Sequence, residues 1–330
     1  MNLHLFDTSQ YIYSGSRDKY IVRGGRNTDA GWLPNKLPVG GISYLLNVMK
    51  EWYDENNEIV FCIDNPPHVK REIFETFLSD FGRYKGNRPG AEEAIKFQKN
   101  NVAEILQTLG FNAVGVPGYE ADDIIASIVK YYKDDYEHIY IHTLDSDLYY
   151  LVDKTVEIMP LSNTNFIQKY FRGRKISTRG KYIHMGNWED SVLKDRVCPY
   201  NILTLIKLMD GEPGDNIPGI KKSIADKIVS NLNRSYFKEC GNNEFVKEFV
   251  LNCAQGDLTT KAILELIQPI ILPFRDIELV ETEFDELSYN YLAKLTKNTY
   301  SEINTGLIVP RTEKIDKLLD KYIEEFNGGE

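Results

Sequence analysis

The sequence lacks the features that mark membrane proteins and disulfide-stabilised secreted proteins. Its four cysteines form no CxxC pair, so neither a thiolate zinc site nor a redox pair is indicated, and we expect free thiols in a reducing cytoplasm. The longest apolar runs, Ile59–Ile63 and Pro269–Phe274, are far shorter than the roughly 20 residues that cross a bilayer. The N-terminus has no basic region followed by an apolar stretch, so we expect no secretory signal.

A basic surplus is missing as well. The chain has 39 Lys and Arg against 49 Asp and Glu, a net charge of −10, and this total alone argues against a nucleic-acid binder. The charge is segregated, however. Lys169–Lys181 holds six basic residues and no acidic one, whereas residues 275–330 hold 13 acidic and 7 basic residues. The position of the acids in the fold therefore matters more than their number.

What the sequence does contain is the pattern of an α/β protein. With 330 residues, 42% of them hydrophobic, the chain can bury one large core or two smaller ones. Short apolar runs alternate with helical periodicity, which predicts a parallel sheet covered by helices on both faces. The expected strands are Leu3–Phe6, Ile59–Ile63, His138–Thr143 and Val156–Met159, and the expected helices are 44–53, 91–109, 124–132, 202–209, 224–232, 245–253 and 261–267.

Aspartates follow three of the expected strands. Asp7 follows the first strand, Asp64 the second, and Asp145 and Asp147 the third. Each alone could be a helix cap or a turn former. Because the carboxyl ends of parallel strands share one edge of a sheet, we expect these carboxylates to converge there, where they would repel one another unless cations lay between them.

Two further acidic segments extend this set. Glu120, Asp122 and Asp123 precede or open an expected helix, where acids also serve as ordinary dipole partners; Glu120 and Asp122 can share a site only if Glu120 lies before the helix begins. Glu212 and Asp215 lie in a turn-rich loop. Ligands that offer only oxygen select hard cations such as Mg²⁺ or Mn²⁺, and two such ions about 3.5–4 Å apart suit phosphodiester hydrolysis.

Two basic segments suggest contacts with phosphate. Tyr84–Arg88 lies in a region where basic residues alternate with aromatic ones, which is typical of single-stranded nucleic-acid binding but also of a solvated helical hairpin. Residues 215–223 lead into the helix near Ile224, with Ser223 and Asp226 spaced as a capping box. Gly219 permits close backbone approach, and Lys221 and Lys222 would supplement the amides of the helix start; the alternative is a plain helix–turn–helix corner.

Together these residues resemble the structure-specific 5′ nucleases, the family of flap endonucleases, phage 5′–3′ exonucleases and the N-terminal nuclease of bacterial DNA polymerase I. The resemblance spans residues 3–282. It rests on Asp7, Leu37-Pro38-Val39-Gly40-Gly41, Asp64, Tyr84-Lys85-Gly86-Asn87-Arg88, Gly118-Tyr119-Glu120-Ala121-Asp122-Asp123, Asp145-Ser146-Asp147 and Gly214-Asp215-Asn216-Ile217-Pro218-Gly219.

The resemblance implies specific roles. Asp7, Asp64, Glu120 and Asp122 would hold one Mg²⁺, with Asp123 assisting through water, and Asp145, Asp147 and Asp215 the second, with Mn²⁺ as a substitute. Lys85 and Arg88 would act on the scissile phosphate beneath a helical arch formed by residues 65–110. Tyr84, Gly219, Lys221 and Lys222 would contact DNA, and a helix–three-turn–helix motif around Gly219 would also bind K⁺.

The sequence departs from the family pattern at two positions. Gly211 is followed by Glu212 where the family has Asp. Glu212 remains a candidate metal ligand, although its side chain is longer than that of Asp. The hairpin runs from Gly219-Ile220 directly into Lys221, without the family's second Gly-Ile-Gly. The basic stretch Lys169–Lys181 is longer than the family's connection, and we interpret it as an added DNA contact through Arg172, Arg174, Lys175 and Arg179.

We therefore predict a three-layer, PIN-like α/β nuclease core in residues 1–198, a helical duplex-binding region in 199–282 and an acidic extension of unknown role in 283–330. The predicted function is a metal-dependent 5′ nuclease of replication and repair that removes RNA primers or 5′ flaps. We expect it to bind branched DNA and RNA–DNA duplexes, to interact with replication proteins and not to bind a membrane. We expect a free-standing enzyme of the bacterial or phage-infected cytoplasm. The alternatives are a catalytically silent protein that binds branched DNA and a PIN-type single-strand ribonuclease.

Overall fold

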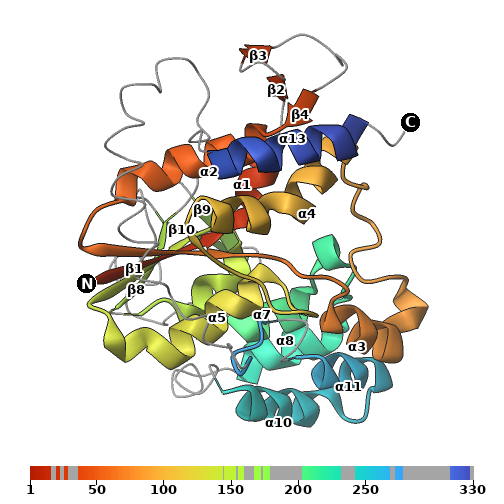
Figure 1. Cartoon of the computed structure of the whole chain (residues 1–330). Coiled ribbons are helices and arrows are strands. Elements are labelled where there is room, and N and C mark those ends of the chain that lie inside the picture. The colour runs from red at the N-terminus through yellow and green to blue at the C-terminus, as the bar shows by residue number, and fades with distance from the viewer. Residues whose placement is uncertain are drawn as a thin grey trace. The chain divides into compact units, whose positions relative to one another are not determined.

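A computed structural model describes residues 1–15, 20–22, 26–28, 36–143, 145–153, 155–159, 167–171, 174–178, 203–231, 242–267, 272–277 and 313–327 (Figure 1). The chain forms two compact units. The first comprises residues 1–64, 90–116 and 279–330, and the second comprises residues 65–89 and 117–278.

The first unit is built on three parallel strands. They lie in the order β6 (Asn112–Val114), β5 (Asn57–Cys62) and β1 (Asn2–Asp7). Both strand pairs are parallel, and Asp7 at the end of β1 lies opposite Cys62 at the end of β5. The last five residues of β1 are all buried, as expected for a parallel strand covered on both faces.

Helices α1 (Thr8–Gly15), α2 (Gly40–Met49) and α4 (Glu93–Thr108) pack against one another in this unit. The glycine pair at the start of α2 has a steric cause, because a Cβ on Gly41 would lie 2.5 Å from the Cα of Ile12. The buried Gln98 side chain accepts hydrogen bonds from the backbone N–H groups of Gly41 and Ile42, at 2.8 and 3.3 Å. A side chain of α4 thereby satisfies the free amides that open α2.

The acidic C-terminal segment contributes helix α13 (Glu313–Asn327) to the same unit. Tyr322 is buried there and meets the ring of Phe97 on α4 edge-on, with 5.6 Å between the ring centroids. Its hydroxyl donates to the carboxylate of Glu104, also on α4, and Figure 1 shows the two helices side by side. The sequence was interpreted here only as an acidic extension, although apolar residues at helical spacing from Ile315 to Phe326 indicate this helix. A small antiparallel sheet of β2 (Tyr20–Val22), β3 (Arg26–Thr28) and β4 (Lys36–Pro38) completes the described unit.

The second unit contains the parallel pair β7 (His138–His142) and β8 (Val156–Met159), together with α5 (Ala121–Tyr132). Helix α5 buries most of its residues, among them Ile124, Ile125 and Ile128. Short 3-10 helices, η4 (Ser146–Leu151) and η5 (Pro213–Asp215), occupy the acidic loops. An antiparallel pair, β9 (Ile167–Phe171) and β10 (Arg174–Thr178), runs through the basic stretch.

The remaining helices of this unit are α3 (Val69–Leu78), α7 (Leu203–Asp210), α8 (Lys222–Asn231), α10 (Asn243–Ala254) and α11 (Leu258–Glu265). Helix α10 packs against α7, α8 and α11, and α11 also packs against α3 (Figure 1). Asn242 caps α10 and Asp257 caps α11, each with its side-chain oxygen accepting from backbone N–H groups of the first turn, which satisfies free amides at the helix start.

The predicted α/β class with parallel strands is confirmed, and every expected strand and helix occurs within a few residues of its expected position. The predicted capping box is wrong: α8 begins at Lys222, and the amides of Ile224 and Ala225 donate to the carbonyl of Lys221, so Ser223 already lies inside the helix. The domain boundary predicted at residue 198 lies outside the described residues and stays a prediction.

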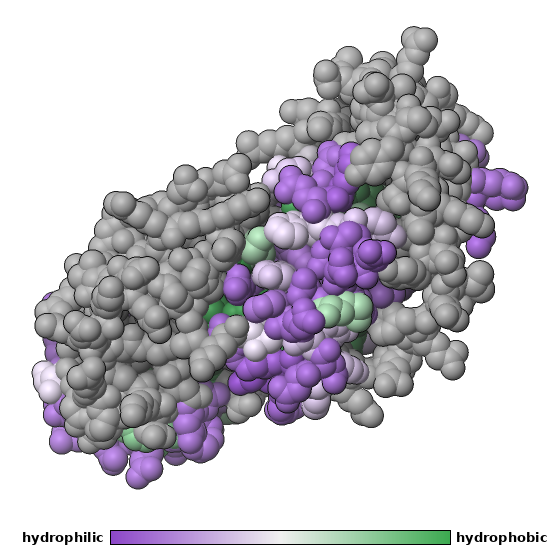
Figure 2. Space-filling model, turned by 90° about the vertical axis from the view of Figure 1, so that its left-hand side faces the viewer, coloured by the Kyte–Doolittle hydropathy of each residue, from purple (hydrophilic) through white to green (hydrophobic). Residues whose placement is uncertain are grey.

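No helix in the described part of the chain is long and apolar enough to span a membrane, and the described surface on the face in Figure 2 is mostly hydrophilic.

Candidate functional site

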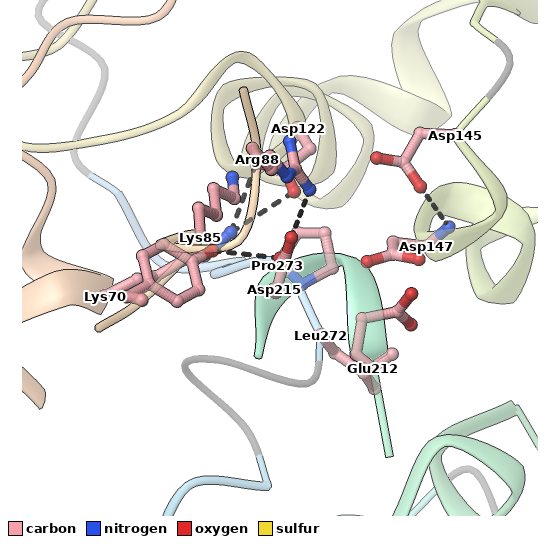
Figure 3. Close-up of a pocket in the computed structure, with 11 residues that line it drawn as sticks. Lys70, Lys85, Arg88, Asp122, Asp145, Asp147, Glu212, Asp215, Leu272 and Pro273 are labelled. Carbon is pink, nitrogen blue, oxygen red and sulfur yellow. Dashed lines mark hydrogen bonds and ion pairs between the residues drawn. The ribbon is translucent and has the colours of Figure 1, made fainter. Parts of the chain in front are cut away.

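A polar pocket in the second unit gathers acidic and basic side chains from five segments. Its volume is about 110 Å³, well above the roughly 10–15 Å³ that one water needs. Figure 3 shows Asp145, Asp147 and Glu212 on one side of the pocket, with Lys70 and Lys85 on the other. The residues that line it are Lys70, Tyr84, Lys85, Arg88, Asp122, Asp145, Asp147, Glu212, Asp215, Leu272 and Pro273.

Three of the predicted acids, Glu120, Asp122 and Asp123, form a first group that we call the α5 carboxylates. Glu120 has extended backbone angles and precedes the helix. Sharing a site with Asp122 was expected to require this position, and the structure confirms it. Asp123 is fully buried, and its carboxylate accepts hydrogen bonds from the backbone N–H groups of Glu120 at 3.0 Å and Phe274 at 2.7 Å. It therefore ties the start of α5 to the 272–277 segment.

Lys70 of α3 lies among the α5 carboxylates. Its Nζ is 3.1 Å from Glu120 Oε2, 3.2 Å from both oxygens of Asp122 and 2.8 Å from Asp123 Oδ1. Burial acts to raise the pKa of Glu120, but Lys70, a hydrogen bond from His68 and Lys85 together hold that pKa well below its ordinary value. Burial raises the pKa of Asp122 well above its ordinary value, because the opposing charge of Lys70 does not offset it.

The other predicted acids of this unit, Asp145, Asp147, Glu212 and Asp215, form a second group that we call the η4–η5 carboxylates. Asp145 lies between β7 and η4, after the strand that it was expected to follow. Asp147 belongs to η4, and its backbone N–H donates to Asp145 Oδ1 at 2.9 Å. Burial, followed by the neighbouring charge of Asp147, raises the pKa of Asp145 to about 8.

The loop that carries Glu212 and Asp215 is held by its own backbone. Gly211 has a φ of +71°, and a Cβ there would lie 2.4 Å from the backbone nitrogen of Gly219, so only glycine fits this turn. The N–H of Glu212 donates to Ile217 O at 2.9 Å, and the N–H of Ile217 donates to Glu212 O at 3.0 Å. Lys207 of α7 bridges the group, pairing with Asp147 and lying 2.8 Å from Glu212 Oε2.

The Tyr84–Arg88 segment joins the two groups. Lys85 pairs with Glu120, whereas Arg88 pairs with Asp215, and the Tyr84 hydroxyl lies 3.2 Å from Glu120 and 3.3 Å from Asp215. The backbone N–H of Lys85 donates to Asp215 O at 3.1 Å. This segment is thus docked onto the η5 loop by both main-chain and side-chain contacts.

Asp7 and Asp64, the remaining predicted metal ligands, belong to the first unit. Asp7 is the last residue of β1 and Asp64 follows β5, so both lie at the same end of two neighbouring parallel strands, in which Asp7 pairs with Cys62. Asp7 is buried, and the Asp64 carboxylate accepts from Ser9 Oγ at 2.6 Å and from Lys99 Nζ at 3.0 Å. Their predicted role as ligands stays a prediction.

The residues predicted to contact DNA are spread over several elements. A Cβ on Gly219 would lie 2.6 Å from the backbone oxygen of Met209, so this glycine allows the chain to pass close to α7. Lys221 is exposed and pairs with Asp257, and Lys222 is exposed at the start of α8. Arg174 and Lys175 lie in β10, whereas Arg172 and Arg179 lie outside the described residues.

Sequence reasoning did not single out Lys70 or Lys207. Lys207 left a usable signal, because it is a charged residue in the otherwise apolar helical segment 202–209, and a lysine there needs a buried partner. Lys70 left no such signal, since α3 is rich in charged residues. The pocket residues Leu272 and Pro273 belong to an apolar run that carried no functional pattern.

The donor set fits divalent metal ions of the hard class. Ligand oxygens of the three α5 carboxylates lie within 4.8 Å of one another. Every acidic side chain that lines the pocket offers oxygen, and the lining contains no His or Cys. Such donors favour Mg²⁺ and Mn²⁺ over zinc.

Comparison with known proteins gives a consistent picture. Residues 2–177 match the model of the family described as 5′-3′ exonuclease, N-terminal resolvase-like domain. A 5′-3′ exonuclease of Aquifex aeolicus is 25% identical over 315 residues, covering 95% of this chain and 96% of the relative. The thermostable DNA polymerase I of Thermus thermophilus is 27% identical over 213 residues, 64% of this chain but only 21% of the polymerase. A solved T5 protein co-crystallised with metal ions shares the fold, with a TM-score of 0.50, 16% identity and 98% of both chains covered.

Proposed function

The chain belongs to the family of 5′-3′ exonuclease N-terminal, resolvase-like domains, and we propose that it is a metal-dependent, structure-specific 5′ nuclease. It hydrolyses phosphodiester bonds at 5′ ends or flaps. The observation that carries this proposal is the pocket in which five carboxylate side chains meet Lys85 and Arg88. Carboxylates that can hold divalent cations, together with basic side chains that can reach a phosphate, suit phosphodiester hydrolysis.

Mg²⁺ is the proposed cofactor, with Mn²⁺ as a substitute. The α5 carboxylates Glu120 and Asp122 would contribute to one ion, and Asp145, Asp147 and Asp215 to another, with Glu212 as a further candidate. When bound, such ions act as Lewis acids and lower the pKa of a coordinated water. Asp123 would assist the first ion through water, and its carboxylate also accepts hydrogen bonds from the backbone N–H groups of Glu120 and Phe274. Asp7 and Asp64 remain predicted ligands.

Lys85 and Arg88 are proposed to act on the scissile phosphate. In the described structure each pairs with one carboxylate, Lys85 with Glu120 and Arg88 with Asp215. Arg88 keeps 54% of its side chain exposed, so it can turn from its partner to a phosphate oxygen. Lys85 has a φ of +55°, an unusual angle for a residue with a side chain, and its backbone bond to Asp215 O fixes the segment beside the pocket.

The substrate is proposed to be branched or 5′-flapped DNA, including RNA–DNA primer duplexes. Gly219 and Lys221 lie between α7 and α8, and Lys222 begins α8. These residues would contact the duplex backbone as a helix–three-turn–helix motif, and a K⁺ ion there is part of the same proposal. Tyr84 and the basic residues of β10 are proposed as further DNA contacts. The protein is also proposed to interact with replication proteins and to act in the cytoplasm.

A panel of three substrates tests this function. A 5′-labelled flap duplex, a single-stranded RNA of the same length and an unbranched blunt duplex are each incubated with the protein in Mg²⁺, and product lengths are resolved. We expect short labelled products from the flap duplex at a rate well above that of the RNA. Cleavage of the RNA alone would support the ribonuclease alternative, and flap binding without any product would support the silent alternative.

A further inference from the structure

Two lysines of the second unit are buried among its carboxylates. The side chain of Lys70 is 3% exposed and that of Lys207 is 4% exposed. Lysine is almost never buried to this extent unless it is paired, because removing an ammonium from water is costly. Both positions therefore depend on the acids around them.

Lys70 draws on the same oxygens that a metal ion would use. Its ammonium lies within 3.2 Å of carboxylate oxygens of Glu120, Asp122 and Asp123. Those three residues are also the group whose ligand oxygens lie within 4.8 Å of one another. One cation on these oxygens weakens the attraction for a second cation, because like charges at this separation repel.

The arrangement repeats in the other half of the pocket. Lys207 pairs with Asp147 and lies 2.8 Å from Glu212 Oε2. The two lysines come from different helices, α3 and α7, and each serves a different carboxylate group. A surface pair on α10 differs from them: Lys247, whose side chain is 29% exposed, meets a single carboxylate, Glu244, at 3.5 Å, and that carboxylate is 80% exposed.

We propose that Lys70 and Lys207 are positioning residues that act as internal counter-ions, holding the carboxylates together in the metal-free chain and competing with divalent cations for the same oxygens. The inference rests on the metal site of the proposed function. Two consequences of opposite sign follow for each lysine. Its removal should destabilise the metal-free protein, because repelling carboxylates stay buried without a counter-charge, and it should tighten the binding of Mg²⁺.

Thermal unfolding in EDTA and in a series of MgCl₂ concentrations tests both consequences. Lys70→Met and Lys207→Met keep the length of the side chain and remove its charge, and Lys247→Met is the matched control. In EDTA we expect each buried variant to lose roughly 6–15 °C in Tm. In saturating Mg²⁺ the loss should shrink by roughly 3–6 °C, because a ligand that binds about tenfold more tightly stabilises the folded state more. Lys247→Met should follow the wild type in both buffers.

Calorimetric titration with Mg²⁺ at low temperature, where the variants are folded, measures the affinity itself. We expect Lys70→Met to bind Mg²⁺ about tenfold more tightly than the wild type, which corresponds to about 1.4 kcal/mol. Lys70→Arg keeps the charge and should restore wild-type affinity. Equal losses of Tm in EDTA and Mg²⁺, or an unchanged or weaker affinity in Lys70→Met, would overturn the inference and make Lys70 a packing residue.

Flap cleavage by the wild type separates this inference from the proposed function. A wild type that cleaves flaps in Mg²⁺ while the lysine variants show unchanged Mg²⁺ affinity would refute the counter-ion role alone. A wild type that binds Mg²⁺ with the predicted dependence on Lys70 but cleaves no flap would refute the nuclease function and leave the counter-ion role supported.

Discussion

The α5 carboxylates and the η4–η5 carboxylates both offer oxygen ligands, but the chain assembles the two groups differently. The α5 carboxylates come from one continuous tetrapeptide, Glu120–Asp123, held by the start of a helix. The η4–η5 carboxylates come from two segments that are more than 60 residues apart in the chain and are bridged by Lys207. Lysines compensate both groups, Lys70 and Lys85 the first and Lys207 the second. Each group also contains a carboxylate whose burial raises its pKa, Asp122 in the first and Asp145 in the second. The two groups therefore differ in how the chain assembles them: one short segment provides the first, whereas the second requires α7 to pack beside η4.

The largest effect is expected when one acid is removed from each carboxylate group. Asp122→Ala and Asp147→Ala should each abolish flap cleavage, because each deletes a proposed metal ligand. DNA affinity should stay within a few-fold of the wild type or improve, since an acid no longer repels phosphate. Glu248→Ala, on the exposed side of α10, is the control. Near-normal turnover in either pocket variant would show that its group holds no essential metal.

A smaller effect is expected from the basic residues that link the groups. Lys85→Ala should lower the single-turnover rate by roughly a hundredfold or more, the scale of contacts to developing charge. Arg88→Ala tests the same role from the η4–η5 side. Rates measured at saturating substrate decide the matter. A loss that vanishes at saturation would make Lys85 a residue that positions the DNA backbone.

The third prediction concerns pH in the metal-free protein. A folded pKa of about 8 for Asp145, against an ordinary 3.8, means that the folded state binds this proton more tightly. The stability that Asp145 contributes is therefore complete below pH 4 and is lost as pH rises to about 8, by up to about 1.4 kcal/mol per pH unit. Denaturant unfolding in EDTA between pH 5 and 8 should show this loss in the wild type but less of it in Asp145→Asn. Identical pH slopes for the two proteins would contradict the assigned pKa.

The smallest effect is expected outside the pocket, in the basic stretch. Neutralising Arg172, Arg174, Lys175 and Arg179 together should flatten the slope of log K against log salt by about two to four units, since each lost phosphate contact removes nearly one. Cleavage at saturating substrate should change little, because none of these residues is assigned to metals. Titration of a flap duplex at several KCl concentrations measures the slope. Parallel lines for variant and wild type would mean that the stretch does not touch DNA.

Much of the fold could be predicted from the sequence, because its elements carry local signals. The run Ile59–Ile63 is long enough to indicate a buried strand, and helix 91–109 has clear periodicity. Strand β6 is only three residues long, too short for such a signal. Helix α13 could have been identified, because its apolar residues recur at helical spacing from Ile315 to Phe326. What the sequence could not indicate is its packing partner, since Tyr322 contacts Phe97 and Glu104, more than 200 residues away in the chain.

The acidic residues of the candidate site could be predicted because they cluster in the sequence, but the lysines that pair with them could not. Glu120, Asp122, Asp145 and Asp147 stand in short acidic motifs at the ends of predicted strands or helices, so their convergence follows from the topology of a parallel sheet. Lys70 lies in the charge-rich helix α3, where a lysine is usually solvated, so no local pattern marks its burial. Lys207 stands out in a mostly apolar segment, but its acidic partners follow only from the packing of α7 beside η4 and the Glu212 loop.

The most direct test of the account is the metal dependence of flap cleavage. A 5′-labelled flap duplex is incubated with the wild-type protein in EDTA, in MgCl₂ and in EDTA followed by excess MgCl₂, and the products are resolved by length. We expect short labelled products in Mg²⁺, none in EDTA and full recovery when Mg²⁺ is restored. Equal cleavage in EDTA and Mg²⁺, or an intact substrate at every Mg²⁺ concentration, would contradict it.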